Sequence, residues 1–417
     1  MITVCAHDGE SCDTKAISMH GFQIDEKRDS KEVYVCDRVT GEKTDKTERI
    51  FDFVGFVSNV KDELLVVFPK HYRVTKEETD ARRVFACIAE HMQKKPELYI
   101  GADSRDIYRS NFPFAAFFGI YEYFAAYGLY FRDETFIRPN TGGRISWKET
   151  ISRSEKYMAG GNMILFPLYY RKNYHFSNFV TECMIFAIDY TIQKFGIFID
   201  AAPTGEEFPQ TPFLENREYV VTVLQQLRQQ TFKDNEQRLI DHLTAFFSGI
   251  HVGGSYYLKH YAFSAIWEDM VTAYLCKYYK GMDAARAIVF DKMSGKHLSF
   301  SKRKFYPNQA KPAQYIEPDH YAEDGDIQLI FDAKYYTYVR GMDYKQIAYV
   351  YMLRGRLDPK TGHSKFRDTY SALILPAERR DTKIHFQLAA PYGGADELLI
   401  TEEYLDISEV MAAYLQE

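Results

Sequence analysis

Residues 315–336 read YIEPDHYAEDGDIQLIFDAKYY, and this stretch predicts two short strands joined by an acidic hairpin loop. The second predicted strand, Ile327 to Tyr336, is largely apolar and ends on charged residues. Because side chains alternate between the two faces of a strand, Asp332 and Lys334 point the same way and Ala333 points the other. Charged side chains at the end of a buried strand are costly unless they bind something.

A further carboxylate lies upstream at Asp319, thirteen residues before Asp332. The preceding strand of the predicted hairpin would bring this carboxylate alongside Asp332, with Lys334 as a cationic neighbour. Two carboxylates and a lysine form a site for a hard cation, which is the minimal set for metal-assisted hydrolysis of a phosphodiester. The alternative interpretation is an edge strand that carries a solvated Asp–Lys pair.

Helices are predicted on both sides of this hairpin. Residues 343–354 (DYKQIAYVYMLR) follow the turn residue Gly341, and their helical periodicity places Gln346 on an apolar stripe. Residues 261–279 form the other predicted helix, in which Glu268 also shares a largely apolar stripe. A carboxylate on such a stripe needs a partner, and the predicted metal site supplies one. A glutamate on the helix surface is the alternative.

The composition is that of a globular protein of 417 residues, which is long enough for two or three domains. Hydrophobic residues make up 46% of the chain, enough for a sizeable core. The net charge of −6 excludes a non-specific nucleic-acid coat, so contacts with DNA must come from local basic patches or from a basic partner. Six cysteines without a CxxC pair favour a reducing, cytoplasmic location.

Neither a membrane segment nor a nucleotide site is predicted. The apolar stretches at residues 111–131 and 176–199 both carry charged residues and are better interpreted as buried helices. Residues 294–296 (SGK) come nearest to a P-loop, but His297 stands where Ser or Thr is needed and Phe290 where the first Gly is needed. We therefore expect this chain to bind no nucleotide and no membrane.

The chain ahead of the hairpin predicts a mixed α+β region over residues 1–250, which could divide further into 1–150 and 151–250. Residues 249–255 contain adjacent glycines and are typical of a linker, so the second domain is expected over residues 251–417. The main elements predicted in the first region are a β-hairpin at 53–72 and helices at 77–94, 113–127, 178–195, 215–231 and 235–247.

Pro318-Asp319, followed by Asp332-Ala333-Lys334 at the end of an apolar strand, resembles the signature of PD-(D/E)xK nucleases. The helix after this strand carries Gln346, as in the RecB and McrC groups, although the spacing to the following tyrosine differs. Four stretches follow one another along the chain: the hairpin FVGFVSNVKDELLVVFPKHY, then GRISWKETI, then IWEDMV, and last EPD…DAKYY…KQIAY. That order is similar to the McrC-like nuclease subunits of GTP-dependent restriction systems, specifically the LlaJI-type branch.

The resemblance implies an α/β fold. A restriction-endonuclease-like core with a mixed central sheet flanked by helices would occupy residues 251–417, after the mixed α+β region. It implies a Mg²⁺-dependent endodeoxyribonuclease, with Mn²⁺ as a substitute ion. It also implies a McrB-like AAA+ GTPase partner, a hexameric ring onto which residues 1–250 would dock and to which they could supply an arginine finger.

Each site residue has an expected role under this resemblance. Asp319 and Asp332 would hold the metal, and the backbone carbonyl of Ala333 would add an oxygen ligand. Glu268 would complete the metal shell or bridge to it through water. Lys334 would orient the attacking water or stabilise negative charge on the phosphate.

The remaining expected contacts are with the substrate. Gln346 would position Lys334 or the scissile phosphate, and Lys302, Arg303 and Lys304 would contact the DNA backbone unless they form a solvated loop. Two other functions remain open: a stand-alone restriction or repair nuclease, and a non-catalytic adaptor that stimulates a partner NTPase. The intact set of two carboxylates and a lysine argues against the adaptor.

Overall fold

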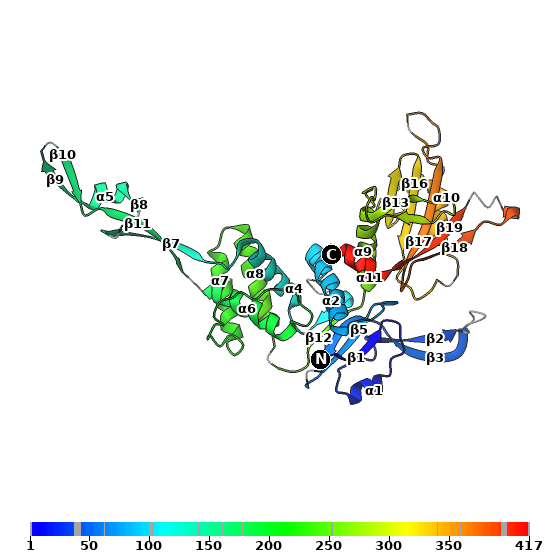
Figure 1. Ribbon diagram of the computed structural model, residues 1–417, viewed down its shortest axis with the longest axis horizontal. Coiled ribbons are helices and arrows are strands. Elements are labelled where there is room, and N and C mark those ends of the chain that lie inside the picture. The colour runs from blue at the N-terminus through cyan, green and yellow to red at the C-terminus, as the bar shows by residue number, and fades with distance from the viewer. Residues whose placement is uncertain are drawn as a thin grey trace. The chain divides into compact units, whose positions relative to one another are not determined.

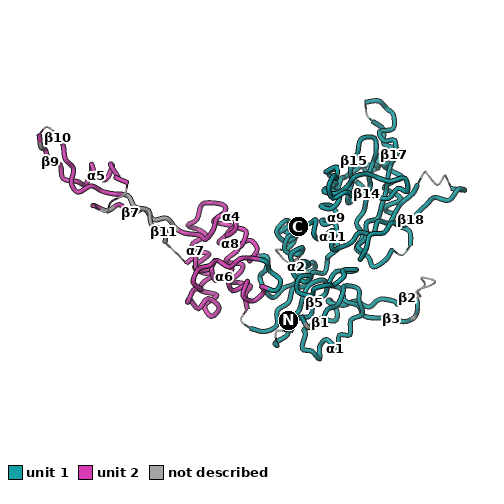
Figure 2. The backbone as a smooth tube through the Cα atoms, in the orientation of Figure 1, with its two compact units in different colours: residues 1–115, 197–200, 252–417 teal, residues 116–196, 201–251 magenta. Residues whose placement is uncertain are grey.

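The chain folds into two compact units (Figure 1, Figure 2). Unit 1 comprises Met1–Ala115, Ile197–Asp200 and Val252–Glu417, and unit 2 comprises Ala116–Gly196 and Ala201–His251. The computed structural model describes residues 2–36, 43–61, 63–99, 104–140, 142, 144–160, 162–176, 179–251, 253–339, 341–358, 360–392 and 398–415.

A five-stranded sheet forms the N-terminal part of unit 1. Its strands are β1 (Ile2–His7), β4 (Val54–Ser58), β5 (Leu64–Phe68), β6 (Tyr108–Ser110) and β12 (Tyr257–His260). They lie in the order β1-β5-β4-β12-β6, with β1 parallel to β5 and the other pairs antiparallel. Every residue of β4 and β5 is buried, as expected of apolar strands that are covered on both faces. The predicted hairpin at 53–72 is therefore confirmed.

Helix α2 (Glu77–Lys94) packs against β1 and β5 through its buried apolar face. Its first turn carries acidic residues and its last turn basic ones, which matches the helix dipole and favours these end points. The other elements of this part of unit 1 are α1 (Thr14–Met19), β2 (Ser30–Cys36), β3 (Lys43–Phe51), η1 (Pro96–Leu98) and α3 (Ser104–Ile107).

Another five-stranded sheet forms the C-terminal part of unit 1. Its strands are β15 (His320–Asp324), β16 (Ile327–Ala333), β17 (Asp368–Ala377), β18 (Asp381–Gln387) and β19 (Leu399–Asp406). In the order β15-β16-β17-β19-β18, the three central strands are parallel and both edge strands are antiparallel to their neighbours. The expected mixed central sheet is therefore present.

Helices α9 (Phe263–Tyr278), α10 (Tyr344–Leu353) and α11 (Ile407–Tyr414) pack against this sheet. Val350 of α10 lies in a buried cluster with Leu373 and Leu375 of β17. The fully buried indole of Trp267 on α9 donates a hydrogen bond to the carbonyl of Ile374 at 3.3 Å. The smaller elements of this part are β13 (Tyr279–Met282), β14 (Ile288–Phe290) and η2 (Ala390–Tyr392).

Strand β16 ends at Ala333, whereas the sequence predicted a strand as far as Tyr336. The backbone N–H of Lys334 still donates to the carbonyl of Ile374 on β17 at 2.8 Å. The next side chain, Tyr335, is instead hydrogen-bonded to the turn that follows β5. The prediction extended the strand because these tyrosines have high β propensity, which a contact distant in sequence overrides.

Unit 2 combines helices with small sheets. Phe186 of α6 packs its ring against the rings of Phe213 and Phe247, with centroids 5.1 and 5.7 Å away. The predicted helices of this region are confirmed, with small differences at their ends. The elements are α4 (Phe114–Tyr127), α5 (Trp147–Arg153), α6 (Phe179–Phe195), α7 (Arg217–Gln229), α8 (Asp234–Gly249), β7 (Arg132–Pro139), β8 (Arg144–Ile145), β9 (Glu155–Ala159), β10 (Asn162–Phe166) and β11 (Tyr169–Phe176).

The apolar stretches at 111–131 and 176–199 contain α4 and α6, so both are helical as expected. Within the described ranges, no helix combines the length and apolar character that crossing a bilayer requires. Strand β12 follows the predicted linker yet pairs with β4 and β6. The division into domains at residues 1–250 and 251–417 stays a prediction.

Candidate active site

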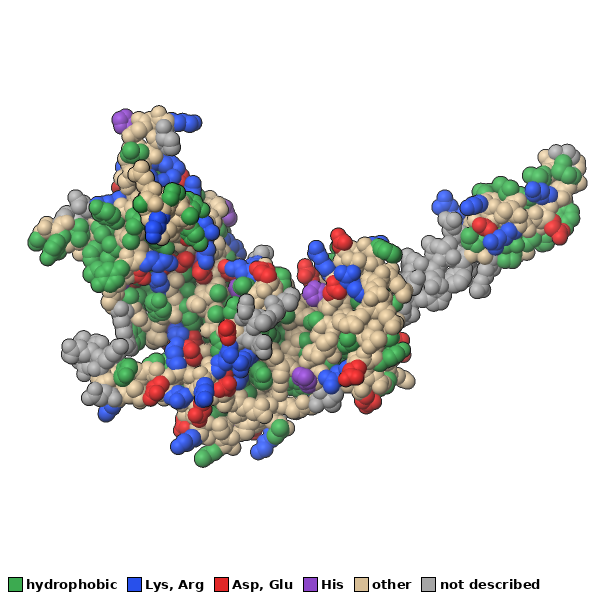
Figure 3. Space-filling view, turned by 180° about the vertical axis from the view of Figure 1, so that it is seen from behind, with side chains coloured by type: hydrophobic (Ala, Val, Ile, Leu, Met, Phe, Trp, Pro, Cys, Tyr) green, Lys and Arg blue, Asp and Glu red, His purple; other side chains and the backbone are tan. Residues whose placement is uncertain are grey.

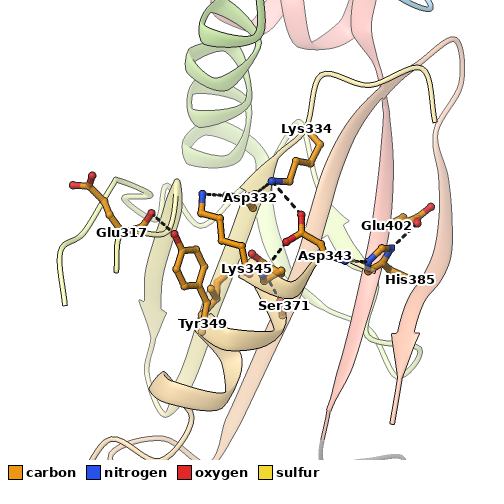
Figure 4. A network of polar contacts seen from close by, with 11 residues as sticks. Glu317, Asp332, Lys334, Asp343, Lys345, Tyr349, Ser371, His385 and Glu402 are labelled. Carbon is orange, nitrogen blue, oxygen red and sulfur yellow. Dashed lines mark hydrogen bonds and ion pairs between the residues drawn. The ribbon is translucent and has the colours of Figure 1, made fainter. Parts of the chain in front are cut away.

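Asp332 is the last residue but one of strand β16, and its side chain is fully buried. Lys334 forms an ion pair with one of its carboxylate oxygens, and Lys345 Nζ lies 3.5 Å from the other, Oδ1. Figure 4 shows both ammonium groups directed toward this carboxylate. A buried carboxylate is thus flanked by two cations at the end of a central strand.

Asp319 comes immediately before β15, and the antiparallel register of β15 and β16 places it opposite Asp332. His320 pairs with Phe331, so the next position along the ladder opposes Asp319 and Asp332. Burial, a hydrogen bond with Asp332 and the charges of Asp332 and Glu268 raise the pKa of Asp319 to about 8. The two carboxyl groups therefore share a proton at neutral pH when no cation lies between them.

The pKa of Asp332 is lowered, although burial alone would raise it. The hydrogen bond from Asp319 and the positive charges of Lys334 and Lys345 favour the ionised form. The environment thus divides the pair into one proton donor and one carboxylate acceptor. A divalent cation bound between them would take the place of the shared proton.

Lys334 is held between two carboxylates, Asp332 and Asp343 (Figure 4). Its Nζ lies 3.2 Å from Asp343 Oδ2, and only 14% of its side chain is exposed. Burial opposes its charge, but these two carboxylates together raise its pKa above the usual value. Lys334 therefore remains an ammonium group in a fixed position.

Lys345 was missed by the sequence reasoning. It lies in the first turn of α10, two residues after the N-cap Asp343, whose side chain accepts a hydrogen bond from the N–H of Gln346 at 2.9 Å. Half of the Lys345 side chain is exposed, at 51%, so its ammonium group can reach both Asp332 and solvent. One sequence signal could have identified Lys345: it lies in the first turn of the predicted helix that follows the predicted active-site strand.

Asp343 and His385 were also missed. The backbone N–H of Asp343 donates to Nε2 of His385 at 3.1 Å, and Nδ1 of this ring lies 2.9 Å from Glu402 Oε1 (Figure 4). Since Nε2 accepts, Nδ1 carries the proton and donates it to Glu402. The edge strand β18 thus holds the start of α10. No local sequence pattern connects His385 with a residue so far upstream.

Glu268 lies on α9 and forms an ion pair with Lys302, whose Nζ is 2.5 Å from Glu268 Oε1. Its charge is one of the causes of the raised pKa of Asp319, after burial and the interactions with Asp332. Its position as a metal ligand stays a prediction.

The predicted DNA-binding run has three different environments. Lys302 forms an ion pair with Glu268, whereas Arg303 forms one with Glu323 at 3.2 Å. Lys304 lies over the ring of Tyr315, with its Nζ 4.3 Å from the ring centroid. Lys302 is therefore the member of this run that forms an ion pair with a predicted site residue.

Gln346 is fully buried in α10. Its side-chain nitrogen donates to the carbonyl of Ile330 and to Ser371 Oγ, both at 2.8 Å. Tyr349 on the same helix donates its hydroxyl hydrogen to the carbonyl of Glu317 at 3.0 Å. Gln346 therefore ties α10 to β16 and β17, and its predicted action on Lys334 or on a phosphate stays a prediction.

The donor set fits a divalent metal ion. Asp319 and Asp332 would supply hard oxygen ligands, and their opposed positions in the ladder would let one cation contact both. Ala333, whose carbonyl is the further predicted ligand, ends the same strand. In the described part of the chain, no group of three or more His, Cys, Asp or Glu side chains is already arranged around one point. A metal would therefore draw Glu268 or water into its shell.

Comparison with known proteins gives a family and weak structural likenesses. The sequence matches the family model described as "LlaJI restriction endonuclease" over residues 53–381. No curated protein matches it.

Two solved structures from Thermococcus gammatolerans are similar. McrC bound to McrB AAA+ hexamers, in a half-complex of a tetradecameric assembly, shares 13% identity at a TM-score of 0.38, over 99% of this chain and 98% of that chain. A chain of the McrBC complex shares 9% identity at a TM-score of 0.22, over 61% of this chain and 82% of that chain. Both TM-scores are too low to add to the assignment.

Proposed function

Because the chain belongs to the LlaJI restriction endonuclease family, we propose that it hydrolyses DNA phosphodiester bonds with a Mg²⁺ ion held by Asp319 and Asp332. The observation that carries this proposal is the fully buried Asp332 carboxylate at the end of β16, which lies opposite Asp319 in the β15–β16 ladder and beside two lysine ammonium groups. Such a pair of carboxylates binds a divalent cation, and Mn²⁺ would serve as a substitute.

When bound, the metal lowers the pKa of a water molecule and neutralises charge on the phosphate. Around it, the residues of this chain have separate tasks. Lys334, fixed by Asp332 and Asp343, orients the attacking water or stabilises the developing negative charge. Lys345, which is half-exposed, faces the incoming phosphate, and Glu268 completes or water-bridges the metal shell.

Metal binding can be tested apart from cleavage. Titration of Mn²⁺ into the full chain, followed by electron paramagnetic resonance, should show one site that Asp319→Asn weakens by at least about tenfold. Asp324→Asn removes a carboxylate from the other end of β15, where it pairs with Lys296, and should leave this site unchanged. Equal Mn²⁺ affinity in Asp319→Asn and the parent would refute the ligand assignment.

We also propose that the chain works with a McrB-like AAA+ GTPase. The resemblance noted in the sequence implies a partner of this kind. Independent support comes from unit 2, in which α5, β9 and β10 carry exposed large hydrophobic side chains (Figure 3). These are Trp147, Ile151, Tyr157, Met158, Met163, Ile164 and Phe166.

A group of large apolar side chains exposed on neighbouring elements typically marks a protein interface. Met158 and Met163 face each other across the β9–β10 ladder and are 74% and 57% exposed. This hairpin lies within residues 1–250, the region expected to dock. We therefore propose that it contacts the GTPase ring.

The docking test uses the full chain, because a cut at residue 250 would remove β12 from the sheet that contains β1, β4 and β5. A Met158→Ser/Met163→Ser double variant should lose binding to the GTPase in a pull-down and fail to raise its GTP turnover. Met293→Ser, at a 95% exposed methionine of unit 1, is the matched control. Parent-like stimulation by the double variant would refute docking through the hairpin.

The same reagents separate the alternative functions. Plasmid DNA with Mg²⁺ is incubated with the chain alone, with the GTPase, and with the GTPase and GTP. Cleavage by the chain alone at the full rate would indicate a stand-alone nuclease. GTPase stimulation without cleavage under any condition would indicate the adaptor.

A further inference from the structure

The segment from Tyr335 to Met342 connects Lys334 with Asp343, which are two members of the charge cluster. The Lys334 ammonium group forms ion pairs with both Asp332 and Asp343. The far end of the segment is held by the hydrogen bond from the Asp343 N–H to His385. Its near end is held by residues from the opposite end of the sequence.

The near end packs against the turn after β5. The backbone N–H of Lys70 donates to the hydroxyl of Tyr335 at 2.9 Å. The neighbouring His71 donates from Nε2 to the carbonyl of Thr337 at 2.8 Å. Two consecutive residues of the turn after β5 thus bind two positions of the segment that follows Lys334.

The Lys70 side chain adds a buried ion pair to this contact. Its Nζ lies 2.5 Å from Asp8 Oδ2 and 4.3 Å from the centroid of the Tyr335 ring. The exposed fractions of the Lys70, Asp8 and Tyr335 side chains are 13%, 7% and 8%. Removing either partner of a buried ion pair leaves an uncompensated buried charge, so Lys70 and Asp8 depend on each other.

Three separate parts of the chain meet at this point. A Cβ placed on Gly9, which follows β1, would lie 3.4 Å from both Lys70 Cε and Thr337 Oγ1. On the other side, the ring of Tyr335 packs against Phe263, the first residue of α9, with centroids 5.4 Å apart. Tyr335 is therefore enclosed by the N-terminal sheet and by the helix that carries Glu268.

We propose that Lys70 and Tyr335 are positioning residues of the nuclease, through which the N-terminal sheet sets the place of Lys334. This inference rests on the proposed assignment of Asp332 and Lys334 to the active site. Lys70 acts on Tyr335 by its backbone N–H and its ammonium group, and Tyr335 acts on Lys334 through the peptide bond between them. Neither positioning residue touches the DNA or the metal.

The consequence for catalysis is geometric. A displacement of about 1 Å in a group that acts on the reacting atoms can cost about 100-fold in rate. Lys334 is the first residue after β16, so a shift of Tyr335 is passed directly to it. The state of the β4–β5 hairpin is thereby coupled to the reactivity of the site.

The test measures DNA binding and single-turnover cleavage separately in the full chain, with its GTPase partner and GTP present. Tyr335→Phe keeps the ring but removes the acceptor for the Lys70 N–H, and should slow cleavage about tenfold at saturating DNA. DNA affinity should stay within about twofold of the parent, since the contact is not a DNA site. A general loss of folded protein would lower both quantities together.

Lys70→Met removes the ammonium group at similar length and should slow cleavage by a similar factor, whereas Lys70→Arg should restore most of it. Tyr336→Phe is the matched control, because Tyr336 is the adjacent residue, is 50% exposed and loses the same hydroxyl. Thermal unfolding of each variant, followed by circular dichroism, confirms that the compared proteins are folded at the assay temperature.

Asp332→Ala is measured in parallel to separate the two proposals. Cleavage by Asp332→Ala at the parent rate would overturn the active-site assignment. Loss of cleavage in Asp332→Ala together with parent rates in both Tyr335→Phe and Lys70→Met would overturn the positioning role alone. A reduced rate in Tyr336→Phe equal to that in Tyr335→Phe would also overturn it.

Discussion

Replacing Asp332 with asparagine should abolish cleavage while leaving the protein nearly as stable as before. The side chain is fully buried and contributes one of the two carboxyl groups proposed to hold the metal. Asparagine has the same shape but no charge, so it keeps the packing and loses the ligand. We expect the single-turnover rate to fall by at least about 1,000-fold, which corresponds to about 4 kcal/mol of activation free energy.

The effect on stability follows from the charges that remain. Lys334 loses Asp332 but keeps Asp343, whose Oδ2 is 3.2 Å from its Nζ, so no buried cation is left alone. The interaction with Lys345 is weakened by solvent, because half of that side chain is exposed. Against these losses, the substituted asparagine avoids the desolvation of a carboxylate. We expect the free energy of unfolding to change by less than about 2 kcal/mol.

The assay compares cleavage of plasmid DNA with Mg²⁺ and the stability of the same preparations in urea. Asp326→Asn is the matched control, since Asp326 lies in the loop of the same hairpin and is 55% exposed beside Arg367. It should cut like the parent. A rate for Asp332→Asn within tenfold of the parent would refute the reasoning, as would a loss of stability large enough to explain the loss of rate.

Three other residues of the site give separate outcomes. Lys345→Ala should slow cleavage about tenfold and reduce the slope of log affinity against log salt concentration by about 1, as for a lost phosphate contact; an unchanged slope would exclude that contact. Gln346→Ala should lower the free energy of unfolding by about 1–3 kcal/mol, because two hydrogen bonds to buried groups are lost. A denaturation curve that matches the parent would contradict this. Glu268→Ala should weaken single-turnover cleavage less than Asp332→Asn does, and parent-like rates in both Glu268→Ala and Gln346→Ala would mean that the two helices serve only as core.

The central pair of the site was accessible from sequence because its geometry is local. A hairpin with a short loop fixes the register of its two strands, so the spacing between Asp319 and Asp332 determines that they meet. The helices that carry Glu268 and Gln346 were accessible for the same reason, since apolar periodicity marks the face that packs on the sheet.

Contacts between distant segments were not accessible. Nothing near Lys70 indicates that it approaches Tyr335, and nothing near His385 indicates a bond to Asp343. Likewise, residues 249–255 were interpreted as a linker, and the strand that follows them and pairs with β4 and β6 was not predicted. A single sequence gives the tendency of each segment to form a helix or a strand, but it does not show which distant segment that element contacts.

The position of β12 has a consequence for synthesis of the chain on the ribosome. Tyr257 pairs with Val57, so the edge of β4 remains without its neighbour while all of unit 2 is being translated. At ordinary elongation speeds this interval lasts roughly 10 to 40 s. During that time an apolar strand edge is open to other nascent chains, which is the usual origin of aggregation. Unit 2 can complete its helices meanwhile, and a chain that terminates before Tyr257 should accumulate as insoluble material.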